Sequence, residues 1–205
     1  MNMLEIILLV CIFYTNILLS YQDTVKVSLY YEALCPYSEE FITDQLYPGY
    51  QVLGNALTVE MIPYGKAKRK KVNNEWKIVC QHGPKECYAN KIQACVLGLN
   101  HTQSESLNFI DCVMSTGNPQ NKKYAKKCAN KNKLSWRDIK TCVTDKQGTQ
   151  LIEKFGEKTD NLIPKLEYVP HILFNDKFDE VLENDARNDF LETVCKMFTE
   201  KPNGC

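Results

Sequence analysis

The stretch TVKVSLYYEALCPYSEE, residues 24–40, decides the fold that we predict for this chain. Residues 24–31 alternate in polarity and are rich in β-forming side chains, so they predict a strand. Over residues 36–46 the apolar spacing becomes helical, and Glu39 and Glu40 in the first turn suit a helix N-terminus. The stretch therefore predicts a strand that leads directly into a helix.

A cysteine motif lies at the junction of this strand and helix. Cys35 is followed by Pro36, an aromatic residue and Ser38, which is the layout of a dithiol redox motif whose second thiol is replaced by a hydroxyl. Unpaired backbone N–H groups and the helix dipole stabilise a thiolate at a helix N-terminus. The pattern indicates Cys35 as a nucleophile, and we expect the Ser38 hydroxyl to donate a hydrogen bond to its sulfur.

Two further β segments follow the helix. A second strand is predicted over residues 56–62 and ends at Pro63. A basic turn is predicted over residues 65–71, with a hairpin return over residues 75–79. These segments extend the first strand into a small sheet.

The second half of the chain begins with helices and returns to β structure. Apolar residues at helical spacing predict a block of short helices over about residues 84–160. Residues 168–180 predict a hairpin that turns at Asn175 and Asp176, and a last helix covers about residues 184–198.

This order of elements predicts an α/β protein with a thioredoxin-like fold and a disulfide-stapled helical insertion. In that fold the pair Val169–Pro170 occupies the position of a cis-proline loop that faces the active-site cysteine. We therefore place Pro170 opposite Cys35. A trans peptide at a strand start is the other interpretation of this proline.

Length and charge limit the function classes. The 205 residues suit one domain with a full core or a core domain with an insertion, and we predict one domain over residues 21–205. Lys and Arg total 25, as do Asp and Glu, so no overall charge field favours a nucleic-acid partner. We predict no nucleic-acid binding.

Two local stretches are nevertheless basic. The residues are Lys66, Lys68, Arg69, Lys70 and Lys71 in the first stretch, and Lys122, Lys123, Lys126, Lys127, Lys131 and Lys133 in the second. One interpretation is ordinary solvated surface. The other is an anionic glycan or cell-surface partner, if the two stretches converge.

The N-terminus carries a targeting signal. Residues 3–19 are almost wholly apolar and the chain turns polar from Ser20 to Asp23. The run is short for a membrane span, which needs about 20 residues, so we predict a signal peptide over residues 1–20 and no membrane span after its cleavage. An uncleaved N-terminal anchor is the alternative.

The cysteine count predicts disulfides. Of ten cysteines, Cys11 leaves with the signal peptide, and Cys35 is the one we expect to stay free. The other eight should form bridges in an oxidising compartment: they are Cys80, Cys87, Cys95, Cys112, Cys128, Cys142, Cys195 and Cys205. On one helix, Cys87 and Cys95 would lie about 12 Å apart, too far to pair with each other.

The sequence also bears on glycosylation and metal binding. The tripeptide Asn100-His101-Thr102 predicts N-glycosylation of Asn100 at a surface position. The cysteine spacings do not match those of zinc ligands, so we predict no metal site and no resident cofactor.

The segment CQHGPKECYANKIQAC, residues 80–95, resembles the signature of the gamma-interferon-inducible lysosomal thiol reductase family. The matching residues are Cys80, Gln81, His82, Gly83, Glu86, Cys87, Asn90 and Cys95. The resemblance implies a thioredoxin-like oxidoreductase of endosomes, lysosomes or the secreted space that reduces disulfides in protein substrates. It also implies a catalytic Cys-x-x-Cys pair, which falls on Cys35 and on Ser38, where the thiol is absent.

The missing second thiol leaves two hypotheses. In the first, Cys35 attacks substrate disulfides alone, and turnover needs an external small thiol such as glutathione or cysteine. In the second, the chain is a catalytically weakened binding or effector protein that uses its basic surface. His171, beside the proline loop, would favour a Cys-His hydrolase if it reached Cys35, which is a third hypothesis.

Overall fold

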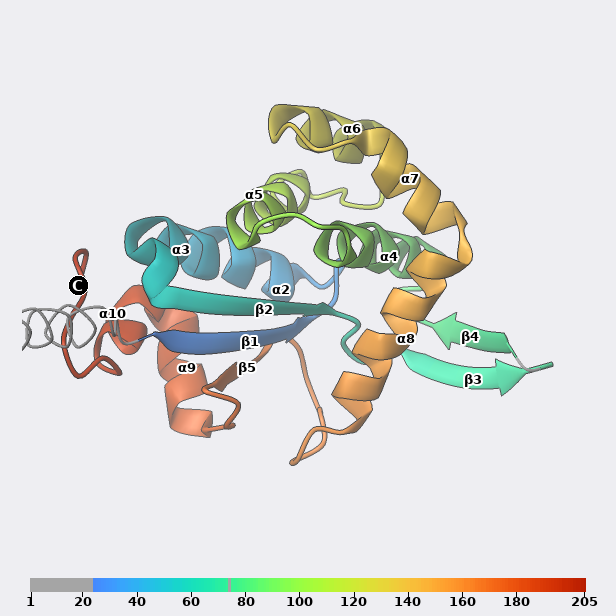
Figure 1. Ribbon diagram of the computed structural model, residues 1–205. Coiled ribbons are helices and arrows are strands. Elements are labelled where there is room, and N and C mark those ends of the chain that lie inside the picture. Colours follow the sequence, from blue (N-terminus) through green and yellow to red (C-terminus); the bar gives the residue numbers. More distant parts are fainter. Residues whose placement is uncertain (1–23, 74) are drawn as a thin grey trace, which may run out of the picture.

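A computed structural model describes residues 24–73 and 75–205 of the chain (Figure 1). The predicted signal peptide, residues 1–20, lies outside the described residues. The central sheet has the strand order β2-β1-β5, formed by β1 Val25–Tyr31, β2 Leu57–Pro63 and β5 His171–Phe174. β1 runs parallel to β2 and antiparallel to β5. The chain therefore has the mixed α/β architecture that the sequence predicts.

The register of the sheet brings two distant segments together. Tyr30, near the end of β1, pairs with His171 at the start of β5. The residues that follow β1 in the sequence therefore lie beside the residues that precede β5. In this way the sheet places the loop of Pro170 next to the turn that contains Cys35.

The helix after Cys35 is longer than predicted. Helix α2 Pro36–Glu40 continues through a π-helical turn, η1 Phe41–Leu46, into α3 Tyr47–Leu53. The prediction ended this run at residue 46. The wider π turn ends two residues before Pro48, which has no backbone N–H to donate within the helix.

The helical block consists of α4 Pro84–Gly98, α5 Gln103–Met114, α6 Lys122–Lys131, α7 Trp136–Thr144 and α8 Lys146–Asp160. In Figure 1, α4 and α5 lie on the same side of the sheet as α2 and α3, and α6 lies farther out. The predicted cap of α7 is present, because Ser135 Oγ accepts a hydrogen bond from Asp138 N. A reciprocal capping box joins Thr102 and Glu105 at the start of α5, which the sequence analysis missed.

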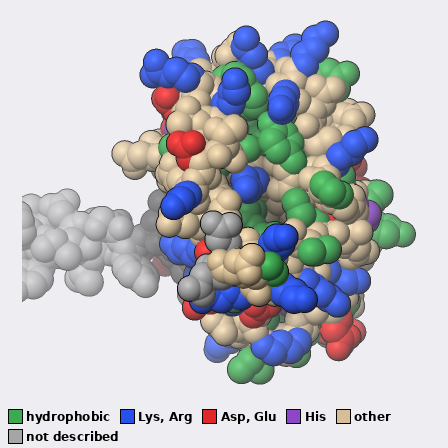
Figure 2. Space-filling view, turned by 90° about the vertical axis from the view of Figure 1, so that its right-hand side faces the viewer, with side chains coloured by type: hydrophobic (Ala, Val, Ile, Leu, Met, Phe, Trp, Pro, Cys, Tyr) green, Lys and Arg blue, Asp and Glu red, His purple; other side chains and the backbone are tan. Residues whose placement is uncertain are grey.

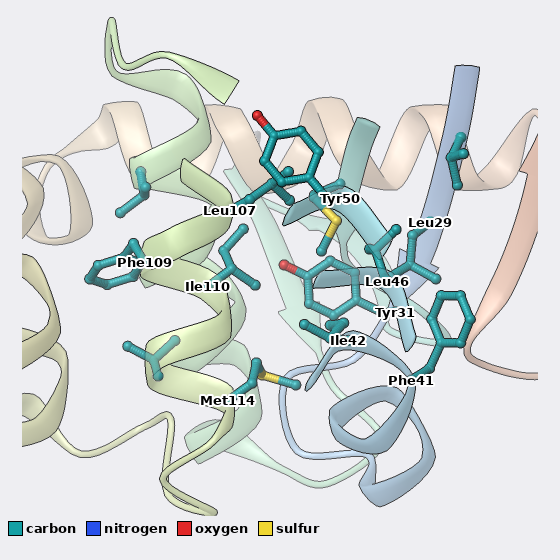
Figure 3. Close-up of a cluster of buried hydrophobic side chains, with 14 of the residues drawn as sticks. Leu29, Tyr31, Phe41, Ile42, Leu46, Tyr50, Leu107, Phe109, Ile110 and Met114 are labelled. Atoms are coloured by element: carbon teal, nitrogen blue, oxygen red, sulfur yellow. The ribbon is translucent and has the colours of Figure 1, made fainter. Parts of the chain in front are cut away.

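The core lies on both faces of β1, whose residues are nearly all buried. Figure 3 shows Leu29 and Tyr31 against side chains from the helical run after Cys35 and from α5. Tyr30 points the other way, into a smaller cluster with Ile62 and Tyr64. A strand buried on both faces is a rigid base for the residues that follow it.

The basic turn predicted over residues 65–71 is shorter than expected, because only Gly65 and Lys66 of this segment lie in a turn. Most of it is strand β3 Lys68–Val72, which pairs antiparallel with β4 Glu75–Val79. Arg69 explains the strand: its guanidinium lies 5.0 Å from the Trp76 ring centroid, and its Nε lies 2.8 Å from Asp160 Oδ2. These tertiary contacts outweigh the weak β-propensity of a lysine-rich segment.

The end of the chain also differs from the prediction. Asn175 and Asp176 have φ angles of 49° and 61°, as the predicted tight turn requires, but the return strand is only an isolated bridge between Phe174 and Lys177. The single last helix is in fact two, α9 Glu180–Asn188 and α10 Phe190–Cys195. Asp189 separates them because its side chain caps the start of α10.

Four disulfides join these elements: Cys80–Cys87, Cys95–Cys142, Cys112–Cys128 and Cys195–Cys205. Cys95–Cys142 links α4 to α7, and Cys112–Cys128 links α5 to α6. These two bridges therefore staple the helical insertion, and Cys35 stays free. Over the described part of the chain, no helix is both long and apolar enough to cross a membrane.

Candidate active site

The free thiol lies at the start of α2. Cys35 has extended backbone angles, and its carbonyl accepts hydrogen bonds from Ser38 N and Glu39 N, both at 3.0 Å. It is therefore the N-cap residue of α2, and its side chain lies at the N-terminal end of the helix. The residue is 8% exposed, so the sulfur lies just below the surface.

The proline loop faces this sulfur. The peptide bond between Val169 and Pro170 is cis, and Val169 O lies 3.9 Å from Cys35 Sγ. The turn of Cys35 and the proline loop, which are separated by more than half of the chain, are thus in contact at the Cys35 sulfur. This is the arrangement that the sequence analysis placed at Cys35 and Pro170.

Ser38 occupies the second position of the motif and is fully buried. Its hydroxyl oxygen accepts a hydrogen bond from Glu32 N at 3.4 Å. The sequence predicted a bond from this hydroxyl to the sulfur of Cys35. The hydroxyl therefore supports the turn between β1 and α2. It offers no second thiol to the site.

Helix α9 holds the proline loop in place. Glu183, with a fully buried side chain, accepts hydrogen bonds from Ile172 N at 2.7 Å and Tyr168 Oη at 2.5 Å. Arg187, one turn later, donates to Pro170 O. Burial disfavours the charge on Glu183, but bonds from His171, Tyr168 and Ile172 N outweigh it and lower the pKa of this carboxyl.

His171 belongs to this support and not to a Cys-His pair. Its Nδ1 lies 3.1 Å from Glu183 Oε1, and its ring packs against Phe178 and Tyr168. These contacts orient Nδ1 of the buried imidazole toward α9. The hydrolase interpretation has no support in this geometry.

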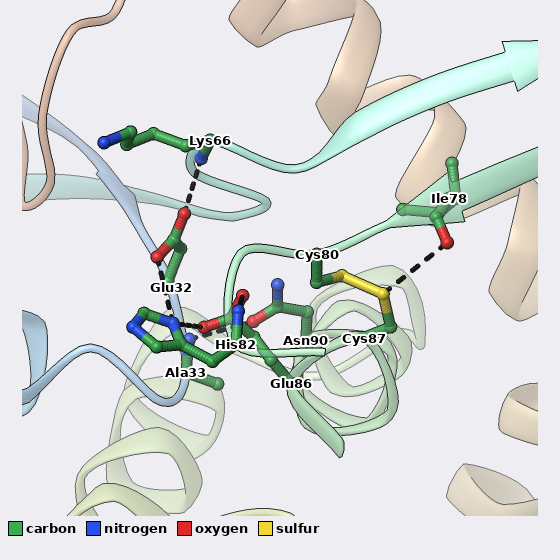
Figure 4. Close-up of a disulfide and its surroundings, with 9 residues drawn as sticks. All are labelled: Glu32, Ala33, Lys66, Ile78, Cys80, His82, Glu86, Cys87 and Asn90. Carbon is green, nitrogen blue, oxygen red and sulfur yellow. Dashed lines mark hydrogen bonds and ion pairs between the residues drawn. A yellow bond between two sulfur atoms is a disulfide. The ribbon is translucent and has the colours of Figure 1, made fainter. Parts of the chain in front are cut away.

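The signature residues clamp the turn before Cys35 (Figure 4). Asn90 Oδ1, on α4, accepts a hydrogen bond from Ala33 N at 2.9 Å. Glu86 Oε1 accepts from His82 N at 3.1 Å, and its Oε2 lies 2.5 Å from His82 Nδ1. The signature thus acts at a distance along the chain, by fixing the backbone two residues before the nucleophile.

The remaining signature residues shape the loop that enters α4. The Cys80–Cys87 disulfide closes this loop, and Gly83 precedes the helix with a φ of 80°, which favours glycine. Gln81 is exposed. The sequence alone indicates no role for His82, whereas in the structure His82 binds Glu86 through its backbone N–H and its Nδ1.

Glu32 is the site residue that the sequence analysis missed. It directly follows β1, its side chain is buried, and its Oε1 accepts a hydrogen bond from Lys66 N at 2.7 Å. Gly65 makes room for it, because a Cβ there would lie 2.2 Å from Glu32 Cγ. Burial raises the pKa of the Glu32 carboxyl, and the nearby Glu86 adds to this effect. In the sequence, the signal that could have identified Glu32 is a single acidic residue directly after an apolar strand.

The other predicted surface features lie away from Cys35. Asn100 is exposed in the loop between α4 and α5, where a glycan could be attached. The lysines of β3 and α6 are exposed, but α7 and α8 lie between these two elements (Figure 1). Figure 2 shows basic side chains spread over this face with apolar and neutral surface between them.

The comparisons with known proteins agree with this geometry. Residues 26–132 match the family model described as gamma interferon inducible lysosomal thiol reductase. GILT-like protein 1 of Drosophila melanogaster is 36% identical over 84% of this chain and 74% of its own length. The gamma-interferon-inducible lysosomal thiol reductase of Carassius auratus is 34% identical over 88% of this chain and 72% of its own.

Solved structures show the same fold. The DsbA of Chlamydia trachomatis aligns with a TM-score of 0.59 over 88% of this chain and 91% of that one, at 11% identity. BdbD of Bacillus subtilis, in its oxidised form, also gives 0.59, over 84% and 88%, at 14% identity. At such low identity the likeness concerns the thioredoxin-like fold alone.

Proposed function

Because the chain belongs to the gamma interferon inducible lysosomal thiol reductase (GILT) family, we propose that it acts on disulfides of protein substrates through Cys35 alone. Family membership and the thioredoxin-like fold support thiol-disulfide oxidoreductase chemistry. One observation carries the finer proposal. Cys35 lies at a helix N-terminus opposite the cis-proline loop, while the second motif position holds the buried Ser38.

The first step uses only groups that the site contains. The Cys35 thiolate attacks one sulfur of a substrate disulfide, a mixed disulfide forms, and the other substrate sulfur leaves as a thiolate. In a dithiol enzyme the second cysteine then displaces the substrate. A hydroxyl at Ser38 cannot attack the sulfur, so the mixed disulfide persists.

Release requires an external small thiol, such as glutathione or cysteine. One thiolate attacks the Cys35 sulfur of the mixed disulfide and frees the remaining substrate sulfur as a thiolate. A second thiolate attacks the small thiol's own sulfur in the resulting mixed disulfide and regenerates Cys35. Two small thiols are thus oxidised to one disulfide for each substrate disulfide reduced.

The surface around the sulfur suits a partly unfolded protein. Tyr37 and Tyr168, from the two segments that flank the sulfur, are exposed. Aromatic side chains in such positions bind apolar segments of many sequences. A substrate disulfide must still reach a sulfur that is mostly covered, so we propose flexible substrates over compactly folded ones.

Insulin reduction tests this proposal. The wild-type protein should turn over insulin only when glutathione is added, and Cys35→Ser should be inactive under both conditions. Ser38→Cys should reduce insulin in repeated cycles with a dithiol such as dithiothreitol and depend less on glutathione. Wild-type turnover that is equally fast without any small thiol would exclude the single-thiol mechanism.

For location, we propose the secreted space or the lumen of endosomes or lysosomes. Four disulfides support an oxidising compartment, and the relative from Carassius auratus is named as lysosomal. Expression in animal cells tests the route, because glycosylation of Asn100 would slow electrophoretic migration until the glycan is removed enzymatically. Asn100→Gln should abolish that shift.

The second candidate is a binding or effector protein with an anionic glycan partner. The absent resolving thiol and the exposed lysines of β3 favour it. Retention on heparin should then fall steeply with added salt, and Lys68→Glu with Lys70→Glu should weaken it further. Retention that these reversals leave unchanged would exclude this surface as the glycan site.

A further inference from the structure

Three potential metal ligands converge below the turn that precedes Cys35. Glu32 comes from the end of β1, and His82 and Glu86 come from the loop and first turn of α4. His82 Nδ1 lies 2.5 Å from Glu86 Oε2 and 3.4 Å from Glu32 Oε2. All three ligand atoms lie within 4.8 Å of one another, and Figure 4 shows the three side chains pointing toward one point.

The two carboxylates of this cluster share one potential cationic partner, because His82 Nδ1 is within ion-pair distance of both. The side chains of Glu32 and Glu86 are both 0% exposed, and two carboxylates at this depth repel each other. Glu32 Oε2 has no hydrogen-bond partner among the described residues, although its other oxygen is bonded to Lys66 N. The Lys66 side chain itself is exposed. A buried carboxylate oxygen that accepts no hydrogen bond, beside one imidazole nitrogen and a second buried carboxylate, is an arrangement that suits a bound cation.

We propose that Glu32, His82 and Glu86 bind a divalent transition-metal ion, with Zn²⁺ the best match. One imidazole nitrogen and two carboxylate oxygens are ligands that Zn²⁺ accepts, and three protein ligands leave a fourth position for water. Ca²⁺ fits poorly because it requires six to eight oxygen ligands. A double positive charge also offsets both buried carboxylates.

The geometry needs only a small adjustment. Tetrahedral ligands at usual zinc bond lengths lie roughly 3.3 Å apart, and the separation of His82 Nδ1 from Glu32 Oε2 is already 3.4 Å. The pair His82 Nδ1 and Glu86 Oε2, at 2.5 Å, must separate by somewhat less than 1 Å. The His82 side chain is 36% exposed, so it is free to move by this amount and gives the ion a path from solvent.

The ion would join the signature loop to the active-site turn without taking part in the redox step. Glu32 O accepts the backbone hydrogen bond of Cys35 N at 3.2 Å. A metal that holds the Glu32 side chain therefore stabilises the backbone on which the nucleophile is placed. The earlier expectation of no metal site rested on cysteine spacing, and none of these ligands is a cysteine.

Zinc titration of the Cys35→Ser variant tests the proposal, because this variant has no free thiol among the described residues to bind the metal. After treatment with EDTA and its removal, isothermal titration with ZnCl₂ should show one saturable site, and ZnCl₂ should raise the melting temperature while CaCl₂ should not. His82→Ala in the same background should weaken binding by at least about tenfold. Glu32→Gln, which keeps the shape of the side chain, should do the same.

His101→Ala is the matched control, since it removes an imidazole from the loop between α4 and α5 and leaves the cluster intact. It should bind Zn²⁺ as tightly as its parent. A melting temperature of Cys35→Ser that does not respond to ZnCl₂ would overturn the proposal, because the cluster would then be balanced by protons. Zinc binding that survives both His82→Ala and Glu32→Gln would also overturn it.

Discussion

Replacing Asn90 with Ala removes the side chain that holds the active-site turn. Asn90 is 1% exposed, and its Oδ1 accepts the hydrogen bond from Ala33 N at 2.9 Å. Without the acceptor, the buried N–H of Ala33 loses its partner, which costs about 1–3 kcal/mol. Ala is a better helix former than Asn by roughly 0.6 kcal/mol. The net loss in the free energy of unfolding should therefore be about 1–2 kcal/mol.

Urea unfolding followed by circular dichroism measures this loss, and the melting temperature should fall by about 2–8 °C for a domain of this size. Asn130→Ala is the matched control, because Asn130 is an exposed residue of α6 and the same exchange there gains propensity without losing a buried bond. Iodoacetamide should also alkylate Cys35 at a different rate in Asn90→Ala, since its turn is released. If Asn90→Ala is as stable as Asn130→Ala and Cys35 reacts unchanged, the signature does not clamp the turn.

Two further predictions concern stability. The pKa of Glu183 is lowered in the folded state, so its stabilising effect is present above the ordinary value of about 4.5 and is lost as the pH falls through the folded pKa. Glu183→Gln should therefore lower the free energy of unfolding by roughly 2 kcal/mol at pH 7. Melting curves should show the difference in melting temperature between variant and wild type narrowing in acid. The Cys95–Cys142 bridge spans 47 residues and Cys195–Cys205 spans 10, so replacing each pair with Ala should cost about 4 and about 2.7 kcal/mol by loop entropy. Equal losses in the free energy of unfolding for the two double-Ala variants, measured by urea unfolding, would contradict that ordering.

Much of the site was accessible from sequence because its signals are local. The alternation of β1, the cysteine before Pro36 and the acidic first turn of α2 all lie within one short stretch. The position of Pro170 followed from the order of elements, because that order indicated a thioredoxin-like fold, in which this position holds the cis-proline loop. Local patterns of this kind reflect backbone preferences that survive in the folded chain.

The missed features depend on contacts between distant residues. No local pattern shows that Glu32 is buried between Lys66 and His82, or that Glu183 holds the proline loop. The lysine-rich segment read as a turn forms β3 because Arg69 contacts α8 and β4. In each case tertiary packing decided the outcome, which a single sequence does not reveal.

The fate of the bond between Cys35 and its substrate tests the central claim most directly. Insulin is mixed with the reduced protein, the reaction is quenched in acid, and intact mass spectrometry measures the covalent adduct over time. The single-thiol mechanism predicts an adduct that persists in the wild type, is absent in Cys35→Ser, and disappears when glutathione is added or when Ser38 is replaced in Ser38→Cys. Absence of an adduct in the wild type, together with a Ser38→Cys variant that neither forms an active-site disulfide nor gains turnover, would contradict it.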